Sequence, residues 1–261
     1  MMTPQLHIEG LSVGYGRRRI IENLTLPAVS GGSVTALVGP NAAGKTTLLR
    51  GLAGLIPVKG TVRLAEIELT ALDSAGHARH VTYMPQTLPQ RVALTVFEAA
   101  LGALRSSGNA TLSTADAHQR ALNVLERLGI AELAMRGLDE LSGGQRQLAS
   151  LAQCIVREPT VLLLDEPTSA LDIHHQLRVM QLVEELARER GLIVLIVLHD
   201  IAQAARYAQR IIVLRQGAIA ADGTPEQAVT PAMLAKVYGV EARVERCSHG
   251  LLQVMVDRAL G

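Results

Sequence analysis

Short apolar runs recur along the chain, separated by segments with helical periodicity. The runs occupy residues 34–38, 81–84, 161–165, 193–198 and 210–214. Each run is short and nearly continuously apolar, which is typical of strands that are buried on both faces. Strands that alternate with helices in this way indicate an α/β fold with a mostly parallel sheet.

The N-terminal region has a different pattern. Residues 5–13 and 18–26 are predicted to be short strands around the turn Gly14-Tyr15-Gly16, and residues 60–65 a third strand. Short strands joined by tight turns predict an antiparallel β layer at the N-terminus.

The middle of the chain is predicted to be helical. Residues 95–106, 114–128 and 142–157 have helical periodicity, and no strand is evident among them. After residue 217 the pattern becomes weaker. We therefore predict a single domain over residues 1–261, in which a helical subdomain at 87–157 is inserted into a core made of residues 1–86 and 158–261.

Composition narrows the choice of compartment and partners. Hydrophobic residues make up 48% of the chain and aromatic residues 2%, so aliphatic side chains must fill the core. A net charge of +1 gives no support for nucleic acid as a partner or for direct binding to an anionic membrane. Cys154 and Cys247 form neither a disulfide framework nor a metal-binding spacing, which favours a reducing cytosolic compartment.

Insertion into a membrane is not expected. The apolar run at 192–198 is far shorter than the roughly 18 residues needed to span a bilayer. Residues 1–9 lack the basic region and apolar stretch of a signal peptide. A role at a membrane would require docking onto a protein that spans it.

Residues 39–46 match the phosphate-binding template of glycine, four residues, glycine, lysine and serine or threonine. The strand predicted at 34–38 precedes the template and a predicted helix at 46–53 follows it, as the template requires. Backbone N–H groups of such a loop and the dipole of its helix bind anions. A chance glycine-rich turn is the alternative, which the complete template disfavours. We expect a P-loop NTPase core that binds a nucleoside triphosphate through Gly39, Pro40, Asn41, Ala42, Ala43, Gly44, Lys45, Thr46 and Thr47.

Two adjacent carboxylates, Asp165 and Glu166, end the apolar run at 161–165. Ligands of parallel sheets bind beyond the carboxyl ends of the strands, so this pair is expected to share an edge with the phosphate loop. Asp165 and Thr46 can then hold Mg²⁺, which takes few carboxylates and keeps several waters. Glu166 can polarise the water that attacks the terminal phosphate. Alone, such a pair would more simply be a solvated loop.

The segment Leu141-Ser142-Gly143-Gly144-Gln145 lies between the phosphate loop and the acidic pair. With these motifs, the chain resembles the ATP-binding cassette proteins, the ATPase subunits of ABC transporters, over nearly its whole length. The resemblance implies that Ser142, Gly143, Gly144 and Gln145 cap the γ-phosphate of ATP held by the other subunit of a head-to-tail pair. Standing alone, the segment would be a serine N-cap with a glycine-rich entry.

Further positions of the family pattern are present. The resemblance implies that Tyr15 stacks on adenine, that Gln86 senses Mg²⁺ and the attacking water, and that His199 contacts the γ-phosphate. It also implies that residues 169–172 carry communication between the two subunits. One departure is Ala42, where many relatives have glycine; because the template leaves this position open, we expect alanine to be tolerated.

A narrower resemblance concerns the transported solute. The segments at 171–176 and 237–240 resemble the subgroup that energises import of iron-siderophores, haem or cobalamin. The implied partners are a second copy of the chain, integral membrane permease subunits and, indirectly, a periplasmic or lipid-anchored substrate-binding protein. The implied location is peripheral, at the cytoplasmic face of the inner membrane, with docking through a groove near Gln86 to Glu98.

Several alternatives stay open. The chain could serve an importer for amino acids, sugars or manganese and zinc, since the permease and the binding protein choose the solute. A soluble cassette protein of translation or DNA repair is disfavoured, because neither a second cassette nor a long coiled-coil insertion is present. A non-enzymatic module gated by nucleotide is disfavoured by the presence of Glu166, His199 and the complete segment 141–145.

Overall fold

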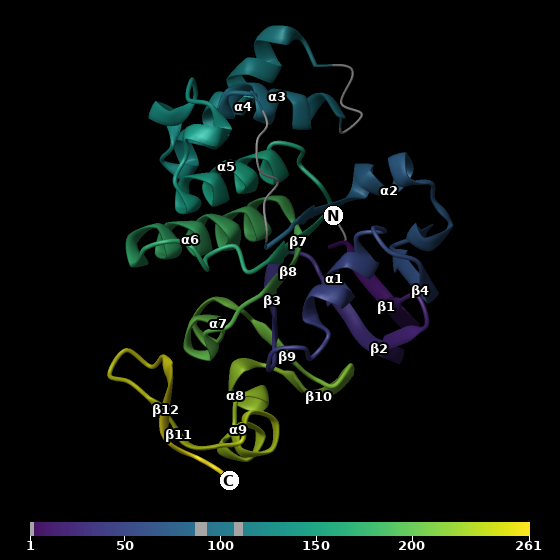
Figure 1. The fold of residues 1–261 in the computed structure, drawn as a ribbon, viewed down its shortest axis with the longest axis vertical. Coiled ribbons are helices and arrows are strands. Elements are labelled where there is room, and N and C mark those ends of the chain that lie inside the picture. The colour runs from purple at the N-terminus through teal and green to yellow at the C-terminus, as the bar shows by residue number, and fades with distance from the viewer. Residues whose placement is uncertain (1–2, 87–92, 107–111) are drawn as a thin grey trace.

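A six-stranded, mostly parallel sheet is the centre of the protein (Figure 1). The computed structural model describes residues 3–86, 93–106 and 112–261. The strand order is β10-β9-β3-β8-β7-β6, and only β10 runs antiparallel to its neighbour. Its strands are β3 (Ser33–Val38), β6 (Val81–Met84), β7 (Val161–Asp165), β8 (Ile193–Val197), β9 (Arg210–Arg215) and β10 (Ala218–Gly223). This arrangement confirms the predicted fold class.

The predicted N-terminal β layer is an antiparallel sheet with the order β2-β1-β4-β5. Its strands are β1 (Gln5–Tyr15), β2 (Arg18–Ser30), β4 (Val58–Leu64) and β5 (Ile67–Glu68). The turn predicted at residues 14–16 was misplaced, because Tyr15 ends β1 and pairs with Arg18. The connection is the two-residue turn Gly16-Arg17, whose positive φ of 56° at Gly16 suits a tight hairpin.

Side chains alternate between two hydrophobic cores, one on each face of the parallel sheet. In β3, Val34, Ala36 and Val38 belong to one core and Leu37 to the other. Figure 1 shows α6 (Ile173–Arg190) and α7 (Ile201–Tyr207) on one side of this sheet. On the other side lie α1 (Lys45–Leu52) and the antiparallel sheet. In the chain, the 3₁₀ turn Leu69–Ala71 and α2 (Ser74–His80) come after β5.

The predicted helices of the middle region form a separate layer at one end of the molecule (Figure 1). They are α3 (Val96–Ser106), α4 (Thr114–Leu128) and α5 (Gly143–Ile155), with 3₁₀ turns at Ala131–Leu133 and Leu138–Glu140. Their apolar faces join the same core as α6 and one face of the sheet. The layer is therefore packed onto the sheet, chiefly through α5.

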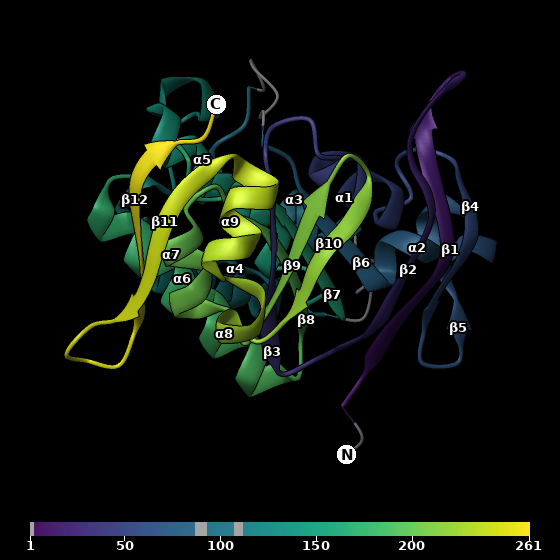
Figure 2. The ribbon, with the colours of Figure 1, turned by 90° about the horizontal axis from the view of Figure 1, so that it is seen from below.

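The C-terminal region contains elements that the sequence pattern did not predict. After α8 (Pro225–Ala228) and α9 (Pro231–Tyr238), strands β11 (Val240–Arg246) and β12 (Leu252–Ala259) form a separate hairpin (Figure 2). Its exposed face carries ion pairs such as Arg243 with Asp257 and Arg258 with Glu241. Among the described residues, no helix has both the length and the apolar character that crossing a bilayer requires.

Candidate nucleotide-binding site

The phosphate-loop segment connects β3 to α1 and is held in place by close backbone contacts. Gly39 has φ 148°, and a Cβ atom there would lie 2.1 Å from the Leu214 carbonyl oxygen. Gly44, with φ 105°, is the N-cap of α1. The backbone N–H of Gly217 donates to the Ala43 carbonyl at 2.9 Å. The loop is thus fixed against the β9–β10 turn, ahead of a helix N-terminus that can bind an anion.

Ala42 occupies an exposed loop position with φ 62°. A side chain with a Cβ atom costs about 1–2 kcal/mol in this left-handed conformation. Alanine thus introduces a strain that the open position of the template did not indicate, and its tolerance in ATP binding stays a prediction.

Lys45 places a cation against the loop. Its side chain is 6% exposed, and its Nζ donates to the carbonyl oxygens of Gly39 at 2.7 Å and Pro40 at 3.0 Å. Burial lowers the pKa of the ammonium group, while the nearby charges of Glu166 and Asp165 oppose that shift. An ammonium group that is partly freed from water can bind a phosphate oxygen strongly.

Asp165 is fully buried and holds both carboxylate oxygens in hydrogen bonds. Thr46 Oγ1 donates to Oδ1 at 3.2 Å, and the Tyr83 hydroxyl donates to Oδ2 at 3.0 Å. Burial raises the pKa of this carboxyl group, and these hydrogen bonds counteract the rise. Burial likewise raises the pKa of Tyr83 to about 12, so its phenol stays a donor.

The oxygen atoms around Asp165 fit a magnesium ion. The Thr46 hydroxyl and the Asp165 carboxylate are hard ligands, and Gln86, whose amide contacts the neighbouring Glu166, has a further hard oxygen. Mg²⁺ uses one or two protein carboxylates. Within the described ranges, no group of three or more His, Cys, Asp or Glu side chains could hold a metal. The donor set is thus suited to a cation that also binds phosphate oxygens and water.

Glu166 contacts the two other residues that were predicted to be catalytic, Gln86 and His199. Gln86 Nε2 donates to Glu166 Oε2 at 2.6 Å, and His199 Nε2 lies 2.5 Å from Oε1. The pairing of Met84 with Leu164 and of Asp165 with Val197 explains this meeting, because the three residues follow adjacent strands at nearly the same level. Glu166 itself has φ 55°, which turns its side chain out of the strand.

Tyr15 lies at the exposed end of β1, with 45% of its surface exposed. Its hydroxyl accepts a hydrogen bond of 3.3 Å from Arg50, in the last turn of α1. An exposed ring that is tethered to the helix of the phosphate loop can stack on a base.

Ser142 begins α5, and residues 142–145 form a reciprocal cap. Ser142 Oγ accepts from the Gln145 N–H at 3.3 Å, while Gln145 Oε1 accepts from the Ser142 N–H at 3.0 Å. A Cβ atom on Gly143 would meet nothing within 4 Å. This end of α5 is exposed, and within the described part of the chain no hydrogen bond joins it to residues 39–46. Its role toward ATP stays a prediction.

Gln147 is a site residue that the sequence reasoning missed. It is 4% exposed, and its Nε2 donates to the Glu166 carbonyl oxygen at 2.7 Å. Its Oε1 accepts from the Ala170 N–H at 3.0 Å. The side chain therefore ties α5 to the loop that follows the acidic pair. A glutamine on the apolar face that also holds Leu151 and Cys154 was the available signal.

Residues 169–172, predicted to carry communication between subunits, lie directly beside this contact. Ser169 Oγ donates to the Glu166 carbonyl oxygen at 3.1 Å, and Asp172 caps α6 by accepting from the His175 N–H at 2.9 Å. The loop thus connects Glu166 to the start of α6.

Comparisons with known proteins agree with this geometry. The profile of the family described as ABC transporter matches residues 22–169. The ferric enterobactin transport ATP-binding protein FepC of Escherichia coli (strain K12) is 38% identical over 92% of this chain and 89% of that protein. The hemin import ATP-binding protein HmuV of Bordetella avium (strain 197N) is 38% identical over 92% and 94%.

Solved structures show the same fold. A chain from an inward-facing ABC transporter described as metal-chelate type has a TM-score of 0.80 and 25% identity, over 98% of both chains. The dimeric cassette MJ0796 bound to ADP and Pi has a TM-score of 0.77 and 26% identity, over 84% of this chain and 98% of that one. The chain belongs to the ABC transporter family, as an ATPase subunit.

Proposed function

We propose that this protein is the ATP-hydrolysing subunit of an importer that takes up a metal chelate of the iron-siderophore, haem or cobalamin type. The convergence of Gln86, Glu166 and His199 beside the phosphate loop carries the hydrolytic part of this proposal. The names of FepC and HmuV, together with the metal-chelate type transporter, support the choice of solute class.

The residues around the loop have different roles in ATP hydrolysis. Backbone N–H groups of residues 39–47 and Lys45 bind the phosphates of ATP, and Tyr15 stacks on adenine. Thr46, Asp165 and Gln86 would hold Mg²⁺, which, when bound, supplies positive charge to the phosphate oxygens. Glu166 accepts a proton from the attacking water, and His199 donates a hydrogen bond to the γ-phosphate.

The second copy of the chain completes the site. The end of α5 at Ser142–Gln145 has an exposed hydroxyl and exposed N–H groups, but lies apart from the loop of its own chain. A head-to-tail pair would place this end on the γ-phosphate that the partner holds. The dimeric cassette MJ0796 supports such a pairing.

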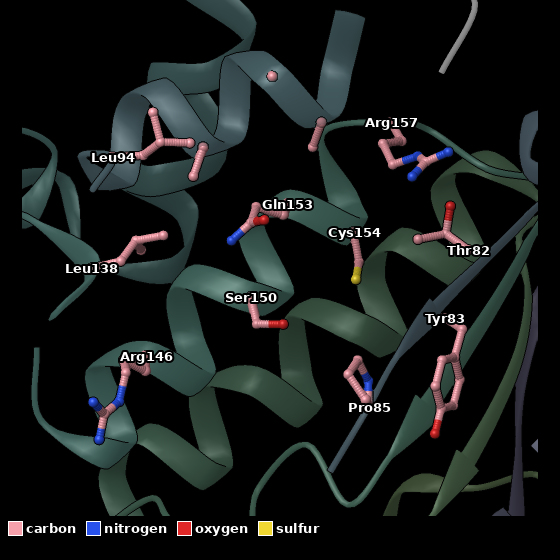
Figure 3. A pocket seen from close by; sticks show the side chains of 13 residues that line it. Thr82, Tyr83, Pro85, Leu94, Leu138, Arg146, Ser150, Gln153, Cys154 and Arg157 are labelled. Carbon is pink, nitrogen blue, oxygen red and sulfur yellow. The ribbon is translucent and has the colours of Figure 1, made fainter. Parts of the chain in front are cut away.

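A groove between the sheet and the helical layer fits the permease. It has a volume of about 410 Å³ and is lined by Thr82 of β6, by Pro85 directly after that strand, by Leu94 and Leu138, and by Arg146 and Arg157 (Figure 3). This groove supports the predicted docking region from Gln86 to Glu98, of which residues 87–92 lie outside the described residues, and the predicted division at 87–157. Through the permease the protein would sit at the cytoplasmic face of the inner membrane and act indirectly with a substrate-binding protein.

Substitution Glu166→Gln tests the shared hydrolytic site. We expect turnover to fall by roughly 10²-fold or more and ATP to trap a dimer that size-exclusion chromatography detects. Adding Ser142→Arg should abolish the trapped dimer without changing the phosphate loop of the same chain. A monomeric Glu166→Gln protein with normal ATPase activity would contradict the shared site.

The solute class is tested with the permease complex in proteoliposomes. Binding protein loaded with a ferric siderophore, haem or cobalamin should stimulate ATP hydrolysis and uptake. Amino acids, sugars, Mn²⁺ and Zn²⁺ are the comparison set. Stimulation by one of these alone would replace metal-chelate import with the corresponding alternative.

A further inference from the structure

Tyr83 is a polar residue in the buried strand β6 that the proposed hydrolysis does not use. Tyr83 pairs with Leu163 of β7, which lies two positions before Asp165 in the same strand. Its ring packs against the core that contains α1. From there its hydroxyl reaches Asp165 Oδ2 at 3.0 Å.

Asp165 depends on side-chain donors because it is 0% exposed. A buried carboxylate is costly unless hydrogen bonds compensate for the water that it has lost. Thr46 occupies one oxygen and Tyr83 the other, and they approach from α1 and from β6. The plane of the carboxylate is therefore fixed from two directions. Thr46 is itself a residue that would hold the metal, so Tyr83 is the donor left to set the orientation from outside the metal site.

Arg50 extends this arrangement toward the nucleotide base. Its guanidinium donates to the Tyr15 hydroxyl at 3.3 Å, and its charge also interacts with the nearby Tyr83 side chain. The positive charge of the guanidinium thus lies near the Tyr83 hydroxyl that donates to Asp165. Arg50 therefore lies between the ring at the end of β1 and the tyrosine that contacts the carboxylate at the end of β7.

We propose that Tyr83 is a positioning residue, which holds the Asp165 carboxylate in the orientation that a divalent cation bound with ATP requires. This inference rests on the proposed function, since it concerns the same nucleotide site. Outer residues that orient a metal ligand typically contribute 10- to 100-fold to metal affinity or activity.

Substitution Tyr83→Phe removes the hydroxyl and keeps the ring. Isothermal titration measures ATP affinity first in EDTA and then at increasing free Mg²⁺. We expect the Mg²⁺ concentration that gives half of the full gain in affinity to rise by about tenfold, while affinity for ATP in EDTA changes less than twofold. Loss of packing alone would instead weaken binding in both conditions.

Tyr207→Phe is the matched control. It also deletes a buried tyrosine hydroxyl, but this hydroxyl has no hydrogen-bond partner among the described residues. Its Mg²⁺ dependence should equal that of the unsubstituted protein. Equal Mg²⁺ dependence in Tyr83→Phe would overturn the inference, whereas absence of Mg²⁺-dependent ATP binding in the unsubstituted protein would overturn the proposed function itself.

The Asp165→Asn background provides a second test, which measures Mg²⁺ dependence rather than stability. If Tyr83 acts through Asp165, adding Tyr83→Phe to Asp165→Asn should shift the Mg²⁺ dependence less than twofold further, because the two positions couple. A further shift of about tenfold would show that Tyr83 acts by another route and would refute the positioning role.

Discussion

Gln147→Met removes the amide that joins α5 to the loop after Glu166. Methionine has nearly the same volume, so the cost of a cavity is small. Three neutral hydrogen bonds are lost: one of 2.7 Å to the Glu166 carbonyl, one of 3.0 Å from the Ala170 N–H, and a longer one of 3.4 Å to the Ser169 hydroxyl. The two shorter bonds each contribute about 0.5–1.5 kcal/mol.

Other groups partly replace the lost partners. The Glu166 carbonyl oxygen still accepts from the Ser169 N–H at 3.3 Å and from its hydroxyl at 3.1 Å. Ala170 is exposed, so its N–H can bind water. We therefore expect the free energy of unfolding to fall by about 1–2 kcal/mol. ATP turnover should fall further, by about tenfold or more, because small displacements of a catalytic group are costly.

Urea denaturation gives the change in the free energy of unfolding, and steady-state ATPase assays well below the unfolding midpoint give turnover. Gln153→Met is the matched control, because Gln153 lies on the same helix and, among the residues that the structure describes, its side chain bonds only to the Ala149 carbonyl of that helix, at 3.4 Å. If the free energy of unfolding of Gln147→Met falls by less than about 0.5 kcal/mol, the range of neutral surface substitutions, and turnover is unchanged, Gln147 does not hold the loop after Glu166 in place.

Three further predictions concern strain, charge and reactivity. Ala42→Gly should raise the free energy of unfolding by about 0.5–1 kcal/mol, since relief of strain at φ 62° exceeds the added chain entropy, with ATP affinity within twofold by titration. Asp165→Asn should stabilise the fold at pH 7, because burial raises the folded pKa of Asp165 and favours the uncharged form. The gain should disappear as pH falls from that raised pKa to about 4, where the carboxyl group of the unfolded chain is also protonated; denaturation at pH 7 and at about pH 4 measures this. Burial raises the pKa of the Cys154 thiol to about 12, so a thiol reagent at pH 8 should label Cys247 and reach Cys154 only after unfolding.

The sequence predicted the parallel strands well because their apolar runs are continuous and short. Strands β6 and β7 have the predicted bounds, and β8 differs by one residue. The N-terminal turn was misplaced because Gly14 suggested a break. In the structure Gly14 lies within β1, where a Cβ atom would be 2.2 Å from the Arg18 carbonyl oxygen. Close approach of two backbones, rather than chain reversal, explains this glycine.

The C-terminal hairpin has an alternating pattern in β11 that predicts a strand. Ala242 belongs to the core and Val244 packs against it. These two residues alternate with Glu241, Arg243 and Glu245. This alternation has the period of a strand. It was obscured because the hairpin is only partly buried, and in β11 charged residues outnumber apolar ones. Tyr83 and Gln147 are a different case, since their importance depends on partners 82 and 19 residues away, respectively.

The contact of Gln147 also bears on how two copies of the chain would act together. Ser142 and Gln147 are five positions apart on α5, which is about 7.5 Å along a helix. The exposed end of α5 and the backbone of Glu166 are therefore linked by little more than one helical turn and one amide. In the proposed dimer, any movement of this end against the partner's nucleotide would shift the Glu166 carbonyl of its own chain. Because Glu166 has φ 55° and is held by Gln86 and His199, a small shift of its backbone changes both side-chain contacts together. The geometry thus provides a short mechanical route by which ATP in one site could set the catalytic carboxylate of the other.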